Sequence, residues 1–300
     1  MVLTASCGHK EIVCPADSVS TIDVKFVWDK APGAEVDGMT LYFYPVSDWT
    51  RMWRFDIAGR EGGKVELPAG RYRLIAVNND LPGIEFTGTD TFNGLTARAR
   101  MADGTSAARP SGILYGAVID NLEVTLCGVE YTLEDGSCKE CPKSLVRCYP
   151  DSMATVYTAV LRDIKGMDRV RSASARLDGV ASSLTVRSGT TGDGTCSIPI
   201  QLSQTAEGGA ELIGSSSGLG TPAGVPGFTL TIAVTRTDGK SFSKSFDVTD
   251  QVIHSPWTRN VHIYIDGLEI PEGTPPDPPE DDDVGIIVDV DGWHVIDIYL

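Results

Sequence analysis

Four cysteines gather in one stretch of the chain and could form disulfides or bind a metal: Cys127, Cys138, Cys141 and Cys148. The Cys-x-x-Cys spacing of Cys138 and Cys141 can supply two ligands of a tetrahedral zinc site, but a second closely spaced pair is absent. Two local disulfides are therefore favoured over zinc. Because no βαβ pattern surrounds the pair, a thioredoxin-type redox role is disfavoured.

The first cysteine, Cys7, stands in a different setting. It directly follows Ala5 and Ser6, as at the end of a bacterial lipoprotein signal peptide, and a polar segment follows it as a tether would. The apolar residue usual three places before such a cysteine is Thr4 here, with Leu3 one place further back. We expect Cys7 to carry a lipid, the alternative being a chance Ala-Ser-Cys. The remaining cysteines are even in number, which fits an oxidising compartment.

Other residue types form no recognisable catalytic or metal-binding motif. The four histidines, His9, His254, His262 and His294, show no metal-ligand spacing. The sequence also has no nucleophile elbow, no His-Glu-x-x-His, no phosphate-binding glycine loop and no dinucleotide fingerprint after a strand. We therefore expect no enzymatic activity, no cofactor and no metal.

Carboxylates and tryptophans allow two weaker hypotheses. Asp247 with Asp250 could ligate calcium, as could Asp289 with Asp291, and some carboxylate pair could form a glycosidase dyad. Solvated strand faces and turns are the simpler interpretation. Three tryptophans could stack on sugars, although core packing is their more usual role in a sandwich: Trp49, Trp53 and Trp257.

Charge and hydropathy restrict the partners. The formal charge is −16, from 25 basic and 41 acidic residues, and no basic cluster reverses it locally. Such a surface repels phosphate backbones and anionic headgroups, so nucleic acid is excluded as a partner. No stretch approaches the roughly 18 apolar residues that a spanning helix needs.

Short segments of period-two hydrophobicity, with abundant glycine and proline, predict strands joined by turns. The clearest follows Leu67-Pro-Ala-Gly-Arg-Tyr72 and should bury Tyr72, Leu74 and Ala76. The stretch 80–112 reads as loops with one or two short edge strands, and 163–169 as one helical turn. Asp238-Gly239 suits a hairpin turn with positive φ. The other expected strands are 22–28, 39–44, 51–57, 64–67, 113–126, 155–162, 173–177, 183–187, 195–201, 228–235, 241–248 and 259–265.

Regularly spaced strands without amphipathic helices predict an all-β protein of two tandem β-sandwich domains with a C-terminal β-tail. The expected division is a lipoprotein N-terminus and tether (1–19), an N-terminal sandwich (20–126), a cysteine-containing interdomain segment (127–150), a C-terminal sandwich (151–270), an acidic proline-rich linker (271–283) and a C-terminal β-segment (284–300).

The last segment is a candidate donor strand. It has strong β-propensity, and Asp291-Gly292 could fold it into a hairpin. An isolated two-stranded unit is marginal in water, so the segment needs a sheet to join, either its own domain's or that of another subunit. Its candidate donor residues are Ile286, Val288, Val290, Trp293, Val295, Ile296 and Ile298.

Several motifs in this order resemble the fimbrillin-like lipoproteins of Bacteroidales, the subunits and anchors of type V pili, within a family known only as a domain of unknown function. They are the Ala-Ser-Cys7 start, the strand entry from Leu67 to Asn78, and the runs 175–181, 246–252 and 289–293. The resemblance implies transthyretin-like Greek-key sandwiches, export to the outer membrane, and polymerisation by strand exchange after a protease removes a first strand. The relatives' arginine cleavage site does not map onto this chain.

From these observations we expect a structural or adhesive subunit, or an anchor, of a surface fimbria. Its partners would be other pilin subunits, the outer membrane through the lipid, and a host or bacterial surface ligand. The alternative is a surface glycan-binding lipoprotein of a carbohydrate-uptake system, whose tryptophans should cluster on one exposed face.

Overall fold

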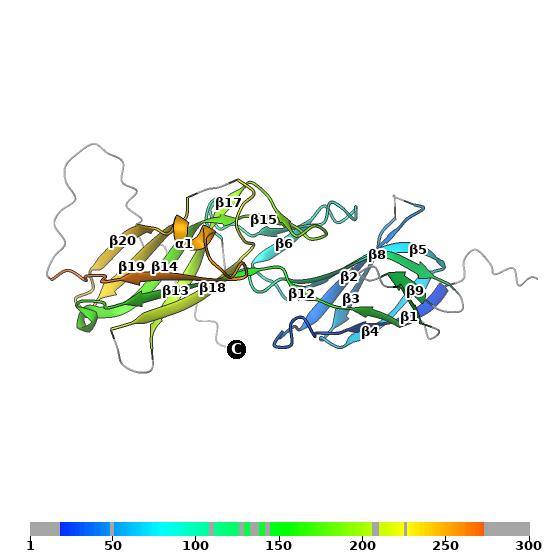
Figure 1. Ribbon diagram of the computed structural model, residues 1–300, viewed down its shortest axis with the longest axis horizontal. Helices are drawn as coiled ribbons and strands as arrows, with labels where there is room; N and C mark the ends of the chain where they lie inside the picture. Colours follow the sequence, from blue (N-terminus) through cyan, green and yellow to red (C-terminus); the bar gives the residue numbers. More distant parts are fainter. Residues whose placement is uncertain are drawn as a thin grey trace, which may run out of the picture.

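The fold follows from the period-two patterns of the sequence. A computed structural model describes residues 19–48, 51–107, 111–125, 129–132, 138–141, 145–205, 210–224 and 227–272; Cys7 and the candidate donor segment lie outside them. Nearly all regular structure in the described residues is strand, which confirms the all-β prediction. β1 (Val19–Phe26) is typical, since exposed and buried residues alternate along its whole length. Two groups of strands lie end to end along the long axis (Figure 1).

The N-terminal unit is a sandwich of two sheets. One has the order β11-β1-β4 and the other β10-β9-β8-β5-β2-β3, with β12 (Asp151–Ser152) added to β8. Their apolar faces enclose one core, in which Ile22 and Phe26 of the first sheet meet Leu41 and Leu74 of the second. The strands are β2 (Gly38–Pro45), β3 (Trp53–Ala58), β4 (Gly62–Pro68), β5 (Gly70–Asn78), β8 (Tyr115–Val124), β9 (Val129–Thr132), β10 (Cys138–Cys141) and β11 (Leu145–Cys148).

The cysteine-rich stretch lies in this unit. β9 pairs with β8, β10 pairs with β9, and β11 pairs in parallel with β1. The expectation that residues 127–150 form a segment between two sandwiches is therefore corrected, because their strands complete both sheets of the first one. Cysteines with few alternating apolar neighbours hid this strand character in the sequence.

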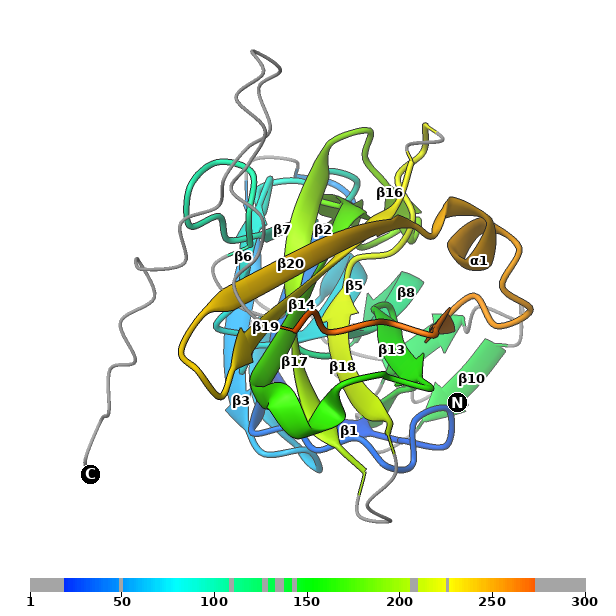
Figure 2. The same ribbon diagram turned by 90° about the vertical axis from the view of Figure 1, so that its left-hand side faces the viewer.

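The C-terminal unit has one continuous strand path, β20-β19-β14-β17-β18-β13-β21, wrapped around a second core (Figure 2). Leu177, Ile200 and Ile232 line this core from one side and Tyr157 and Ile263 from the other. The strands are β13 (Thr155–Arg162), β14 (Val170–Ala181), β17 (Thr195–Gln204), β18 (Leu212–Gly218), β19 (Thr229–Arg236), β20 (Ser241–Asp247) and β21 (Asn260–Asp266).

Two predicted turns of this unit are present, whereas one strand and one short helix were not predicted. Gly239 has a φ of +82° in the hairpin between β19 and β20, as the Asp-Gly pair predicts. The expected helical turn is a 3-10 turn, η1 (Met167–Arg169). The sequence analysis missed β18, whose run of small polar residues has little periodicity, and α1 (Thr249–Ile253).

A third, smaller sheet joins the two units. Its order is β16-β15-β7-β6, so β6 (Ile84–Thr87) and β7 (Thr96–Ala99) from the first half of the chain pair with β15 (Ser183–Thr185) and β16 (Thr190–Thr191) from the second. Ile75 and Val77, on the outer face of β5, pack in a separate apolar cluster with Leu184 and Leu219. Two short strands form in 80–112, where one or two edge strands were expected, but β7 lies inside the sheet between β6 and β15. The division of the chain into two domains stays a prediction.

Candidate functional site

The clearest functional feature of the fold is the position of β1. This strand lies between β11, with which it pairs in parallel, and β4, with which it pairs antiparallel. Its inward side chains Ile22, Val24 and Phe26 are 0–3% exposed, while Asp23 and Lys25 face outward. Loss of β1 would uncover the core and leave two unpaired strand edges, so the fold contains a groove with the shape of one amphipathic strand.

We call this space the β1 groove; its walls are β11 and β4 and its floor is the second sheet of the N-terminal unit. Leu67 on one wall and Val146 on the other are fully buried, as is Leu74 on the floor. Any occupant therefore needs apolar residues at every second position, and hydrogen bonds to both walls would fix its register.

The described chain ends at the opposite pole of the molecule. After β21 the chain runs back beside η1, where the amide of Ile270 donates to the carbonyl of Lys165 (2.9 Å). Arg169 donates to the carbonyl of Ile270 (2.9 Å) and pairs with Glu272. These contacts hold the exit of the chain at the far end of the C-terminal unit from β1 (Figure 1).

The cysteines expected to form one cluster do not all take part. Cys148 is a free cysteine that is 1% exposed in the N-terminal core, which corrects its assignment to a local disulfide or zinc site. Burial raises the pKa of its thiol to about 12, because a buried thiolate loses its hydration. Cys127 and the side chains of Cys138 and Cys141 lie outside the described residues, so their pairing stays a prediction.

Cys196 is the second free cysteine among the described residues. It lies in β17 in the core of the C-terminal unit, and its thiol points to the carbonyl of Ala181 at 3.7 Å. Burial raises its pKa to about 11. Both thiols are therefore neutral core residues at neutral pH.

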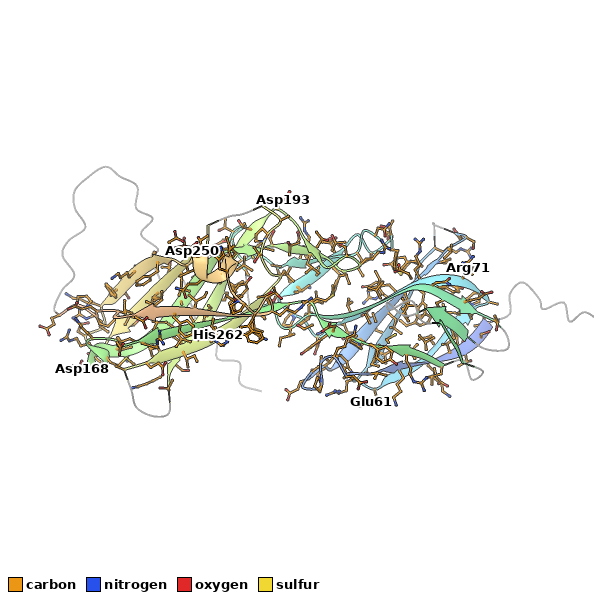
Figure 3. All side chains as sticks on the ribbon, in the orientation of Figure 1. Glu61, Arg71, Asp168, Asp193, Asp250 and His262 are labelled. Atoms are coloured by element: carbon orange, nitrogen blue, oxygen red, sulfur yellow. The ribbon has the colours of Figure 1, made fainter. Side chains whose placement is uncertain are left out.

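No group of three or more His, Cys, Asp and Glu side chains able to hold a metal occurs in the described ranges. Asp247 and Asp250, considered above as calcium ligands, belong to no such group. Asp247 accepts hydrogen bonds from the hydroxyl and amide of Thr249, which lower the pKa of its carboxyl, whereas Asp250 is exposed on α1. His262 lies on β21 and Asp250 on α1, and neither belongs to a group of ligating side chains (Figure 3).

The tryptophans do not form a common surface in the part of the chain that is described. Trp28 belongs to the N-terminal core, and Trp53 is half-buried at the edge of the same unit. Trp257 is 67% exposed but lies in the C-terminal unit. The single aromatic face that glycan binding was expected to show is not present among these residues.

A cleft that the sequence analysis missed opens at the end of the N-terminal unit that faces the C-terminal one. Its volume is about 360 Å³, and we call it the junction cleft. Its walls combine two glycines with carboxylate, amide, phenol and aliphatic side chains: Glu35, Asn78, Asp80, Leu81, Ile113 and Tyr115. These residues come from three distant segments, so no sequence spacing could reveal the cleft.

Within the described ranges no helix is long and apolar enough to cross a membrane.

Comparison with known families places the chain in context. Residues 6–201 match a family described as a domain of unknown function, DUF5119. No curated protein matches the chain in sequence.

Solved structures share the fold. A candidate adhesin from Bacteroides ovatus ATCC 8483 superposes with a TM-score of 0.62 over 92% of this chain and 100% of that chain, at 17% identity. A second candidate adhesin from Bacteroides ovatus gives 0.52 over 83% and 89%, at 9% identity. A third, from Bacteroides thetaiotaomicron VPI-5482, gives 0.50 over 86% and 93%, at 11% identity. The family match confirms the expected family of unknown function, and these structures show that the chain shares the fold of Bacteroides proteins named as candidate adhesins.

Proposed function

The chain belongs to the DUF5119 family, a family of unknown function, and from that premise we propose that it is a non-enzymatic adhesive subunit or anchor of a bacterial surface fimbria that assembles by strand exchange. The observation that carries the proposal is the β1 groove. It is filled by one amphipathic strand, which pairs with β11 on one side and with β4 on the other. An extended segment of another subunit could occupy the same space.

The candidate donor segment has the pattern that the groove requires. In β1 the apolar residues Ile22, Val24 and Phe26 alternate with charged ones, and Ile286, Val288 and Val290 repeat this two-residue period. The intervening positions are charged in both segments, Asp23 and Lys25 in β1 and Asp289 and Asp291 in the tail, although the second has the opposite sign. Such a segment can bury one face against the floor while its backbone bonds to β11 and β4.

The two ends of the described chain support head-to-tail assembly. The tail leaves from the far end of the C-terminal unit, whereas the β1 groove belongs to the N-terminal unit (Figure 1). A donor leaving one subunit at this pole would meet the groove of the next subunit, and repetition would build a linear polymer. Lipid at Cys7 would hold the first subunit at the outer membrane, as an anchor requires.

The test is deletion of residues 284–300 from the full chain. We expect a folded monomer that no longer forms ladders on non-boiled gels. A matched pair separates the donor face from its outer face: Val288→Asp should abolish the ladders, and Asp289→Asn should retain them. Unfolding of the deleted chain, or ladders that persist in the Val288→Asp variant, would overturn the proposal in favour of a tail that packs on its own domain.

A further inference from the structure

Each unit extends an arm from between two neighbouring strands of its own sheet. The N-terminal arm leaves after β5 and returns at β8, and these two strands pair with each other. The C-terminal arm leaves after β14 and returns at β17, which are also paired. Because adjacent antiparallel strands can be joined by a two-residue turn, each arm is longer than its own unit requires. We call the two arms together the clasp; its described residues are 79–107, 111–114 and 182–194.

The two arms pair with each other through their backbones. β7 of the N-terminal arm runs antiparallel to β15 of the C-terminal arm. Beyond one end of this ladder the amide of Ala99 donates to the carbonyl of Ser182 (2.9 Å). Beyond the other end the amide of Val186 donates to the carbonyl of Leu95 (2.9 Å). Since β15 runs roughly along the long axis (Figure 1), pulling the units apart loads these bonds together, in shear, rather than one after another.

The N-terminal arm also reaches the main sheet of the C-terminal unit. The carbonyl of Ser197 on β17 accepts from the amide of Ala107 (2.8 Å), and the amide of Ser197 donates to the carbonyl of Thr105 (3.0 Å). Ala99 and Ala107 are 8% and 4% exposed and belong to the core of the C-terminal unit. A segment from the first half of the chain therefore completes the core of the second half.

The clasp has an apolar cluster of its own. Leu184 and Val186 of the C-terminal arm are 3% and 1% exposed. They belong to one cluster with Leu95 of the N-terminal arm and with Ile75 and Val77 of β5. Fully burying one side chain of this size shifts an equilibrium by about 10- to 150-fold. An opened clasp would expose several of them at once, so the closed form predominates.

Arg187 links the C-terminal arm to the N-terminal unit on the surface. It donates to Asp120 of β8 (3.2 Å) and to Asn93 of the N-terminal arm (3.1 Å). Its guanidinium also lies 5.0 Å from the ring of Phe92, which Arg73 of β5 approaches at 5.3 Å. Two guanidiniums, one from each half of the chain, thus contact the same ring.

We propose that the clasp makes the two units one rigid body that carries tension along the long axis of the molecule. Two units joined by one chain crossing move relative to each other unless a large apolar interface holds them. The covalent crossing follows β12, whose pairing with β8 covers Asp151 and Ser152, so it would give way first under load. With the clasp closed, the load passes through the ladder of β7 and β15 instead. The proposal does not depend on strand exchange, because the clasp lies wholly within one chain.

The first test measures rigidity of the full chain by residual dipolar couplings. We expect one alignment tensor to fit both units of the parent. Leu184→Asp places a charge in the apolar cluster of the clasp and should require two different tensors. Ile253→Asp, at a 39% exposed position on α1, is the matched control and should keep one tensor. Two tensors in the parent would overturn the proposal, as would a single tensor in the folded Leu184→Asp chain.

The second test measures the load, by pulling the full chain from its two termini at constant force. Val186→Ala removes two buried methyl groups from the clasp and should speed the first opening event by about tenfold. Val19→Ala makes the same change at a 54% exposed position and should leave that event unchanged. Because Val186→Ala is a small truncation, it tests the clasp even if Leu184→Asp fails to fold. A first event as slow in Val186→Ala as in the parent would overturn the proposal.

Discussion

The two units close their sheets in the same way but hold their first strands differently. In the N-terminal unit the first strand, β1, pairs in parallel with the last, β11; in the C-terminal unit the first strand, β13, pairs in parallel with the last, β21. Each first strand also has an antiparallel neighbour, β4 or β18. The topology around the two strands is thus equivalent.

The connections at their ends are not equivalent. β13 continues directly from β12, which pairs with β8 of the N-terminal unit, so both of its ends are tied into described sheets. β1 is the first described strand and is tied to the rest of the fold through the loop that leads to β2. Departure of β13 would therefore pull on the pairing of β12 with β8 of the other unit, whereas the described connection of β1 stays within its own unit.

The side-chain pairs on the outer faces of β1 and β13 also differ, and here too the pair on β13 is the more stabilising one. Arg162 on β13 faces Asp266 on β21 and makes two hydrogen bonds to it, at 2.8 and 3.1 Å. On β1, Lys25 faces Arg147 of β11, a pair of like charges. Like charges directly opposite each other weaken strand pairing. The same topology therefore holds one strand with an outward ion pair and one with an outward pair of like charges, and the proposed exchange concerns the second.

The largest expected effect comes from Phe26→Ala in β1. Phe26 is 2% exposed, and such a truncation costs about 3–5 kcal/mol. We expect hydrogen exchange to show easier opening of β1 with little change at β13. Lys25→Ala, on the outward face of the same strand, should stay within about 0.5 kcal/mol of the parent. An equal loss of protection at β13 would mean that the units open together and would break the comparison.

The buried thiols predict a loss of stability in alkali in both units. Each folded-state pKa, about 12 for Cys148 and about 11 for Cys196, is raised above the unfolded value near 9. The folded chain therefore holds protons that the unfolded chain releases, so stability is full below about pH 9 and falls above it, by about 1.4 kcal/mol per pH unit for each thiol.

Denaturant titrations of Cys148→Ala and Cys196→Ala between pH 8 and 11 check this. Each variant should lose one thiol's share of the alkaline slope relative to the parent, and the double variant should lose both. A slope that does not change in Cys148→Ala would mean that this thiol is paired or exposed in solution.

A smaller effect concerns the outer edge of β21. Gln251 of α1 donates to the carbonyl of Tyr264 (3.0 Å) and accepts from its amide (2.8 Å), so one side chain caps the edge as a strand would. Gln251→Ala should cost about 1–3 kcal/mol for two hydrogen bonds, speed exchange of the Tyr264 amide and increase self-association. Asp250→Asn, which alters a 97% exposed side chain on the same helix, is the control and should change none of these three quantities.

The sequence predicted where strands form better than it predicted which strands and surfaces they pack against. Alternation identified β1, β13 and the first half of β5, because there one face is buried and the other is more exposed. It could not show that β5 buries both faces in its second half, since Ile75 and Val77 serve the cluster that joins the units. A continuous apolar run of this kind has no period that distinguishes one covered face from two.

Sites built from distant segments escaped the sequence analysis for a related reason. Tyr115, Asp80 and Glu35 meet in the junction cleft only because β5 and β8 are neighbours and the loop after β1 folds back beside them. The role of Gln251 likewise depends on β21, a sheet edge distant from it in the prediction, whose backbone it hydrogen-bonds. Cross-strand partners such as Lys25 and Arg147 depend on register, which turns and packing set together.

The smallest effect tests this last pair directly. Lys25→Glu places an acid opposite Arg147 and should strengthen the pairing of β1 with β11 by about 0.2–1 kcal/mol, whereas Arg162→Glu places an acid opposite Asp266 and should weaken β13 with β21 by a similar amount. Opening free energies from hydrogen exchange, compared at low and high salt, measure both. If strand exchange operates, Lys25→Glu should also slow polymer formation, because β1 must leave before a donor enters. Faster opening of β1 in Lys25→Glu would show that its outward charges do not set its exchangeability, and the tether at its end would then be the stronger difference between the units.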